Sequence, residues 1–163
     1  MSALARIPLP WSRSCFVCGQ DNPVGLRARC YQVGAAVELP FTTRGEHAGW
    51  SDVMHGGLIA TVLDEVMTWA AILGSGKPCF AADFSVRMLE PLRAGFECVA
   101  SGRMCGDRRR VFDLEGSLAD VSGRVYARAA GRYMPVPRER IPHLRDDFVT
   151  TAGCLDIRHI FGR

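Results

Sequence analysis

The sequence lacks an uninterrupted apolar run long enough to cross a membrane. Its most apolar stretch, residues 58–73, is broken by two threonines and by Asp64 and Glu65, whereas a spanning helix needs about 20 predominantly apolar residues. Residues 1–11 also lack the apolar core of about 7 to 15 residues that a secretory signal requires. We therefore expect a cytoplasmic protein that is neither exported nor inserted into a membrane.

A strong net charge and a disulfide framework are also absent. A formal charge of +3 is too weakly basic to predict a nucleic-acid partner, although it suits an anionic small molecule. The seven cysteines are an odd number in a 163-residue chain, and a chain of this length buries its own core without cross-links. We expect free thiols.

Periodic apolar side chains predict one long helix and about six strands. Within residues 57–73 they recur every three or four positions without a proline, and Gly74 and Gly76 supply a stop. Turn residues at 107–110 and 120–123 make the later strands antiparallel neighbours. Alternation of period two predicts the strands within residues 26–33, 37–41, 84–88, 98–104, 112–118 and 125–133.

The helix and the strands predict an α+β domain over residues 25–134. A sheet of this kind needs a helix to cover its apolar face. Residues 1–24 form an N-terminal segment that contains a CxxC motif and shows no regular pattern. Residues 135–163 open with two prolines and show no sustained period. We expect this last segment to be a surface tail.

The helical stretch also holds the residues that point to chemistry. His55, Gly56 and Gly57 stand at its start, and the acidic pair Asp64 and Glu65 follows in the same helical pattern. A helix N-terminus has unpaired N–H groups and the positive end of the macrodipole, which polarise a carbonyl group. Glycine there lets a ligand approach the backbone. An ionised Asp on an apolar helix is costly and so needs a reason.

The motif MHGGLIATVLDE at residues 54–65 resembles the hotdog-fold thioesterase superfamily, in particular its phenylacetate-degradation-type branch of acyl-CoA thioesterases. CFVCGQDNPVGL (15–26) and FSVRMLEPLRAG (84–95) extend the resemblance over roughly residues 15–134. It implies a hotdog fold, in which a curved antiparallel sheet of about five to six strands wraps one central helix. It also implies a two-fold homodimer that hydrolyses a small or medium acyl-CoA, with an aromatic acyl group as one option, and uses no metal or other cofactor.

The resemblance implies roles for individual residues. Asp64 matches the family carboxylate nine residues after the motif histidine, with Glu65 as its alternative, and Gly56 matches the glycine whose N–H points at the thioester oxygen. Gly49 and Ala81 stand where many relatives carry an Asn and a Ser or Thr that position water or substrate. An acyl-CoA-binding protein without turnover is therefore the first alternative function.

Other roles stay open in the sequence. Asp64 activates water as a general base or attacks the carbonyl carbon itself. His55 orients the acyl group or merely caps the helix, and Gly57 is a further candidate substrate contact. The guanidinium groups of Arg93, Arg108 and Arg109 suit the phosphates of coenzyme A, although charged residues at turns are usually only solvated.

The spacing of two residues predicts a dimer without reference to any family. Gly56 and Asp64 are eight residues apart, which is about 12 Å along a helix. They cannot both contact one carbonyl group. Gly56 of one protomer must therefore face Asp64 of another across a two-fold axis. We predict a homodimer with two equivalent sites, or a dimer of dimers.

Cys15 and Cys18 form a single CxxC followed by Gly19, which is half of a zinc knuckle. A tetrahedral site needs two further ligands, and the nearest options, Cys30 and His47, have no paired spacing. A zinc-linked interaction module is the second alternative function. A redox role would need a thioredoxin-like βαβ pattern, which does not surround this motif.

Overall fold

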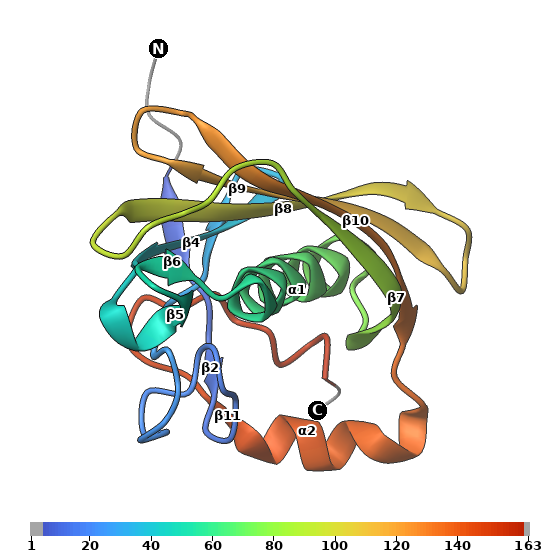
Figure 1. Cartoon of the computed structure of the whole chain (residues 1–163). Helices are drawn as coiled ribbons and strands as arrows, with labels where there is room; N and C mark the ends of the chain where they lie inside the picture. The colour runs from blue at the N-terminus through green and yellow to red at the C-terminus, as the bar shows by residue number, and fades with distance from the viewer. Residues whose placement is uncertain (1–4, 162–163) are drawn as a thin grey trace.

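The computed structural model describes residues 5–161 and shows one long helix wrapped by a curved sheet (Figure 1). The helix, α1, covers Gly56–Ser75. The main sheet within the described range has seven antiparallel strands, in the order β1-β3-β4-β8-β9-β10-β7. The α+β hotdog architecture is confirmed, with more strands than the five to six expected. The strands are β1 (Arg6–Pro8), β3 (Tyr31–Val33), β4 (Ala36–Thr42), β7 (Cys79–Met88), β8 (Glu97–Asp107), β9 (Phe112–Asp120) and β10 (Val125–Pro135).

Both ends of α1 are set by local chemistry. At its start the His55 side chain accepts a hydrogen bond from the Gly57 N–H, which satisfies one of the free donors of the first turn. At its end Gly76 adopts a left-handed conformation, φ 66°, and donates its N–H to the Ile72 carbonyl oxygen. Gly74 lies inside the last turn rather than ending the helix. The predicted helix is confirmed to within two residues at each end.

The sheet fixes the rotation of α1 because the two backbones nearly touch. Val62, Leu63 and Val66 are fully buried against the sheet. At Gly102 on β8, a Cβ would lie 2.6 Å from the Val66 carbonyl oxygen, so only glycine permits this approach. Helix α1 is long and apolar enough to cross a membrane, but the core helix of a globular protein meets the same two criteria. Its close packing holds Asp64 and Glu65 in defined directions.

The N-terminal segment is more regular than the sequence predicted. Its strand β1 pairs with β3 and so joins the main sheet. A further strand, β2 (Trp11–Ser12), pairs with the C-terminal segment. Of the strand predicted within residues 26–33, only the last three residues form a strand, β3. The N–H groups of Leu26 and Ala28 instead donate to carbonyl oxygens of the preceding loop, those of Phe16 and Val17.

The C-terminal segment is not a surface tail, and that expectation was wrong. After η2 (Arg138–Arg140) it forms α2 (Ile141–Asp147) and β11 (Phe148–Val149), which pairs with β2. The segment runs along the side of α1 that faces away from the sheet (Figure 1). Its Phe148 ring lies 5.7 Å from the Trp69 ring of α1 and 4.8 Å from the Phe161 ring. Together with buried Ile157, these aromatic contacts close the core on that side.

The segment predicted as a loop before α1 contains short elements that position His55. These are η1 (Gly45–His47) and the ribbon of β5 (Ala48–Trp50) with β6 (Val53–Met54). The His55 N–H donates to the His47 carbonyl oxygen at 2.8 Å. The later strands pair as predicted, with turns after Asp107 and Asp120.

Candidate active site

The start of α1 presents a backbone N–H for which the described residues supply no acceptor. The Gly57 N–H donates to His55 Nδ1 at 2.9 Å, so a neutral His55 ring carries its proton on Nε2. Among residues 5–161, no group accepts a hydrogen bond from the Gly56 N–H. This donor lies at the positive end of the helix dipole. It is therefore available to a carbonyl oxygen of a ligand.

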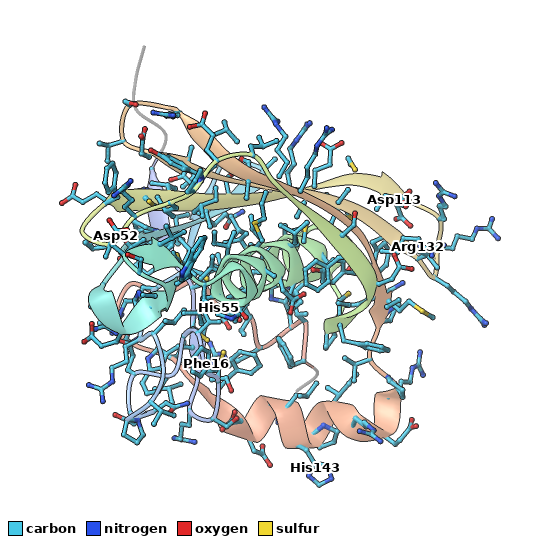
Figure 2. The ribbon with its side chains drawn as sticks, in the orientation of Figure 1. Phe16, Asp52, His55, Asp113, Arg132 and His143 are labelled. Atoms are coloured by element: carbon cyan, nitrogen blue, oxygen red, sulfur yellow. The ribbon has the colours of Figure 1, made fainter. Side chains whose placement is uncertain are left out.

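A cleft of about 380 Å³ opens beside this donor. Its size falls within the range of small-molecule sites. Arg93, which directly follows the cleft residue Leu92, pairs with Asp52 at 2.7 Å, and both side chains are largely exposed. A predicted phosphate-binding residue thus stands at the cleft rim, and its partner Asp52 lies on the same side of the molecule as His55 (Figure 2). The mainly apolar lining comprises Val53, Met54, Gly56, Ile59, Met88, Leu89, Glu90, Pro91 and Leu92.

Gly49 is explained by the packing of His55. A Cβ at Gly49 would lie 2.7 Å from His55 Cδ2 and 3.0 Å from His55 Cα. An Asn at this position, as in many relatives, would displace the imidazole ring. Gly57 is constrained in the same way, because its Cβ would lie 2.9 Å from His55 Nδ1. Both glycines therefore leave the space that the His55 side chain occupies.

Replacing Gly49 by Ala is expected to destabilise the fold by about 1–3 kcal/mol, the usual cost of overpacking. Urea unfolding measures this difference. The matched control is Gly45→Ala in the adjoining η1, where a Cβ would meet nothing within 4 Å, and its expected change stays within about 0.5 kcal/mol. Equal stability of both variants would contradict the packing role of Gly49.

Asp64 lies halfway along α1, with its carboxylate held by a residue that the sequence did not reveal. The hydroxyl of Tyr133 on β10 donates to Asp64 Oδ1 at 2.7 Å. Burial raises the pKa of Asp64, while hydrogen bonds from Tyr133 and Thr68 lower it in part. Burial and the same carboxylate also raise the pKa of Tyr133, which therefore stays a donor. A partly desolvated, oriented carboxylate is suited to act as a base or nucleophile.

Ala81 lies next to this pair. It is the register partner of Tyr133 across β7 and β10. Where many relatives carry a Ser or Thr on this strand, the hydroxyl beside Asp64 comes here from Tyr133 on the neighbouring strand. The absence of a hydroxyl at position 81 therefore does not leave Asp64 without a donor.

Glu65 points to a different place from Asp64. The Cys15 thiol contacts Glu65 Oε2 at 3.5 Å, and the Cys18 thiol lies in the same cluster. Burial, followed by the neighbouring Cys15, raises the pKa of Glu65 to about 8. Hydrogen bonding from Cys18 lowers the pKa of Cys15 to about 5. Glu65 faces the N-terminal segment and does not share the environment of Asp64.

The arginines of the β8–β9 turn are exposed and lie away from the start of α1. Arg108 Nε donates to Asp113 Oδ2 at 2.9 Å, and the Arg109 N–H donates to Asp107 Oδ1 at 2.7 Å. Figure 2 shows Asp113 at the right of the sheet, well apart from His55, which lies below the sheet near the start of α1. Because Phe112 aligns with Tyr133, this turn stands at the end of the sheet where Tyr133 holds Asp64.

Comparisons with known proteins identify the fold. No protein-family model matches the chain, and no curated protein matches it in sequence. Solved structures match over most of the chain. RHA08564, a thioesterase superfamily protein, is 23% identical over 75% of this chain, with a TM-score of 0.71. This chain spans 60% of the length of that protein.

Two further structures have the same fold. The PaaI protein of the phenylacetic acid degradation operon of E. coli is 14% identical over 69% of this chain and 81% of its own, with a TM-score of 0.64. The smu.793 protein of Streptococcus mutans, solved with acetyl CoA, is 17% identical over 63% of this chain and 82% of its own, with a TM-score of 0.59. The chain therefore has the hotdog fold of the thioesterase superfamily, as its motifs predicted.

Proposed function

We propose that this protein is an acyl-CoA thioesterase whose site forms between two copies of the chain. The observation that carries the proposal is the Gly56 N–H, which has no acceptor in the described part of the chain and opens onto an apolar cleft at the positive end of α1. Such a donor stabilises the oxygen of a thioester as negative charge develops on it. The thioesterase names of the similar structures support the same reaction, and we propose that it takes place in the cytoplasm.

The reaction needs a carboxylate as well as a donor. Asp64 either takes a proton from water, which then adds to the carbonyl carbon, or adds to that carbon itself to give an anhydride that water opens. In both routes the carbon–sulfur bond breaks, and the thiolate leaves as coenzyme A and takes up a proton. No metal ion takes part in these steps. The free acid is the second product.

The free edge of β7 offers a way to join two protomers. This strand is the last of the sheet and pairs only with β10 among the described strands. It exposes Phe80 and Met88, and an unpaired apolar edge favours pairing with another strand. Antiparallel pairing of β7 with the partner's β7 would extend the sheet through a two-fold axis.

This pairing would complete the site, because the two ends of β7 lie near different parts of it. The Met88 end lies beside Gly56, where a Cβ would be 3.4 Å from the Met88 methyl carbon. The Ala81 end lies beside Tyr133, which holds Asp64. A two-fold axis brings the first end of one strand opposite the second end of the other. Gly56 then approaches the partner's Asp64, in a dimer or in a dimer of dimers.

The substrate would place its acyl group in the cleft and its coenzyme A moiety over the exposed arginines. Guanidinium groups bind phosphates in a bidentate manner. Arg93 stands at the rim of the cleft, and Arg108 and Arg109 stand at the Tyr133 end of the sheet. In the two-fold arrangement these arginines approach one site from both protomers. The acetyl CoA bound to smu.793 supports a ligand of this class.

Hydrolysis of a panel of short, medium and aromatic acyl-CoA thioesters tests the proposal. Released coenzyme A is followed by chromatography, because the exposed Cys105 would react with thiol reagents. We expect kcat/KM of about 10⁴ M⁻¹s⁻¹ or more for the best substrate, the lower limit for ordinary enzymes. Calorimetric binding of several thioesters without any release would support a binding protein instead.

The Tyr133→Phe variant tests the support of Asp64. Loss of one hydrogen bond to a carboxylate is expected to lower kcat about tenfold and to leave KM unchanged, because the hydroxyl donates to Asp64 Oδ1. Tyr126→Phe is the matched control, since that hydroxyl on the same strand donates to Asp120 in a surface turn. A change in KM alone would show that Tyr133 binds substrate rather than orienting the carboxylate.

A further inference from the structure

Three side chains that can bind a metal ion converge between the N-terminal segment and α1. They are Cys15, Cys18 and Glu65, and their ligand atoms all lie within 4.8 Å of one another. The proposed hydrolysis uses none of them. Cys30 and His47, the ligands considered from the sequence, are not in this group. His47 Nδ1 instead accepts from the Arg44 N–H at 3.1 Å.

The backbone around Cys15 is folded as a tight turn directed at its sulfur. The N–H groups of Val17 and Cys18 lie 3.3 and 3.4 Å from Cys15 Sγ. The Gly19 N–H donates to the Cys15 carbonyl oxygen, and a Cβ at Gly19 would lie 2.4 Å from that oxygen. The glycine after CxxC is therefore required by the turn. N–H groups that point at a sulfur favour the thiolate, which is the form that ligates metals.

The distance from the turn to α1 fits tetrahedral coordination. Cys15 Sγ and Glu65 Oε2 are 3.5 Å apart. Two such ligands at zinc bond lengths of about 2.3 and 2.0 Å would be about 3.5 Å apart at a tetrahedral angle. The second sulfur, Cys18, is buried beside them. Small side-chain rotations would bring all three atoms to one ion.

In the part of the chain that the structure describes, no Lys, Arg or His side chain forms an ion pair with Glu65. A carboxylate and a thiolate held together away from water repel each other unless a cation or protons lie between them. Two sulfur ligands and one carboxylate form a donor set that zinc accepts.

We propose that Cys15, Cys18 and Glu65 bind one zinc ion, with a water molecule as the fourth ligand. The ion ties the turn of the N-terminal segment to α1. Glu65 directly precedes the fully buried Val66 and directly follows Asp64, so ligation also fixes the helix turn that carries Asp64. The proposed zinc site is structural, and the proposed hydrolysis does not use its ion.

Metal analysis of the intact 163-residue chain tests this site without any reference to hydrolysis. After dialysis with zinc and removal of the excess, native mass spectrometry should show one zinc per chain. Cobalt in place of zinc should give a sulfur-to-cobalt charge-transfer band. Cys15→Ser and Glu65→Gln should weaken binding by at least about tenfold, whereas Cys105→Ser, an exposed cysteine on β8, should not.

Thermal unfolding supplies a readout that does not depend on a variant folding normally. Chelation of the ion is expected to lower the Tm of the wild-type protein by at least about 5 °C. A wild-type protein that takes up neither zinc nor cobalt overturns the proposal. Formation of a Cys15–Cys18 disulfide in buffer that contains a reductant also overturns it. Unchanged zinc affinity in Glu65→Gln does so as well.

Discussion

Replacing Asp64 by Asn is expected to lower kcat/KM for acyl-CoA hydrolysis by at least about 100-fold, the usual size of a general-base effect. Asn keeps the shape of the side chain and still accepts the Tyr133 hydrogen bond. It neither takes a proton from water nor attacks a carbonyl carbon. The loss is therefore expected in both mechanisms, and chromatography of released coenzyme A at low substrate concentration measures it.

The control removes a carboxylate that has no such surroundings. Glu97 is exposed at the start of β8 and forms none of the ion pairs within residues 5–161, so Glu97→Gln should leave the rate unchanged. An Asp64→Asn rate within about threefold of wild type would exclude this carboxylate from the reaction. In a single turnover of the wild-type protein in water labelled with heavy oxygen, label recovered in Asp64 would identify direct attack, with water opening the anhydride at the Asp64 carboxyl carbon.

The parts of the molecule that depend on local pattern could be predicted from the sequence. The 20-residue helix repeats its apolar positions over about five turns, which is long enough to distinguish its period from a chance arrangement of apolar residues. The long strands β8, β9 and β10 likewise alternate over many positions. Strands β1 and β2 have three and two residues, too few to show a period. The C-terminal segment escaped prediction because Phe148 packs against Trp69, a residue far away in the sequence, and Phe161 packs against Phe148 in turn.

Two features of the site could not be predicted for the same reason. Tyr133 reaches Asp64 from 69 positions away, and its place in an alternating strand indicated only that it is buried. A buried Tyr hydroxyl needs a hydrogen-bond partner, which was the one available signal. Glu65 was predicted as the alternative catalytic carboxylate because it adjoins Asp64 in the sequence. Only the docking of the N-terminal turn shows that Glu65 meets Cys15 instead.

Replacing Gly56 by Pro is expected to lower kcat by about 10²–10³, the effect of losing one oxyanion donor. Proline removes the N–H and is favoured at the first position of a helix. The preceding residue, His55, already has the extended conformation that proline requires, with φ −62° and ψ 128°. Helix α1 should therefore form normally, and circular dichroism and Tm check that it does.

The matched variant Gly56→Ala keeps the N–H. Its Cβ would lie 3.4 Å from the Met88 methyl carbon, which is ordinary contact distance, so its kcat should stay close to that of the wild-type protein. If the Pro and Ala variants lose activity equally, the space at Gly56 matters and its N–H does not. In that case the donor on which the proposed function depends would have to be sought elsewhere.

The two inactive variants together test whether the site is shared between protomers. In a hybrid dimer of Asp64→Asn and Gly56→Pro chains, one site combines the intact Gly56 of the first chain with the intact Asp64 of the second, and the other site has both changes. Purified through two different tags, this hybrid should recover about half of the wild-type rate per dimer, since one of two equivalent sites is intact. If each site lay within one protomer, both sites of the hybrid would be defective. A hybrid as inactive as its parents would then show that the roughly 12 Å between Gly56 and Asp64 is bridged in some way other than by a second chain.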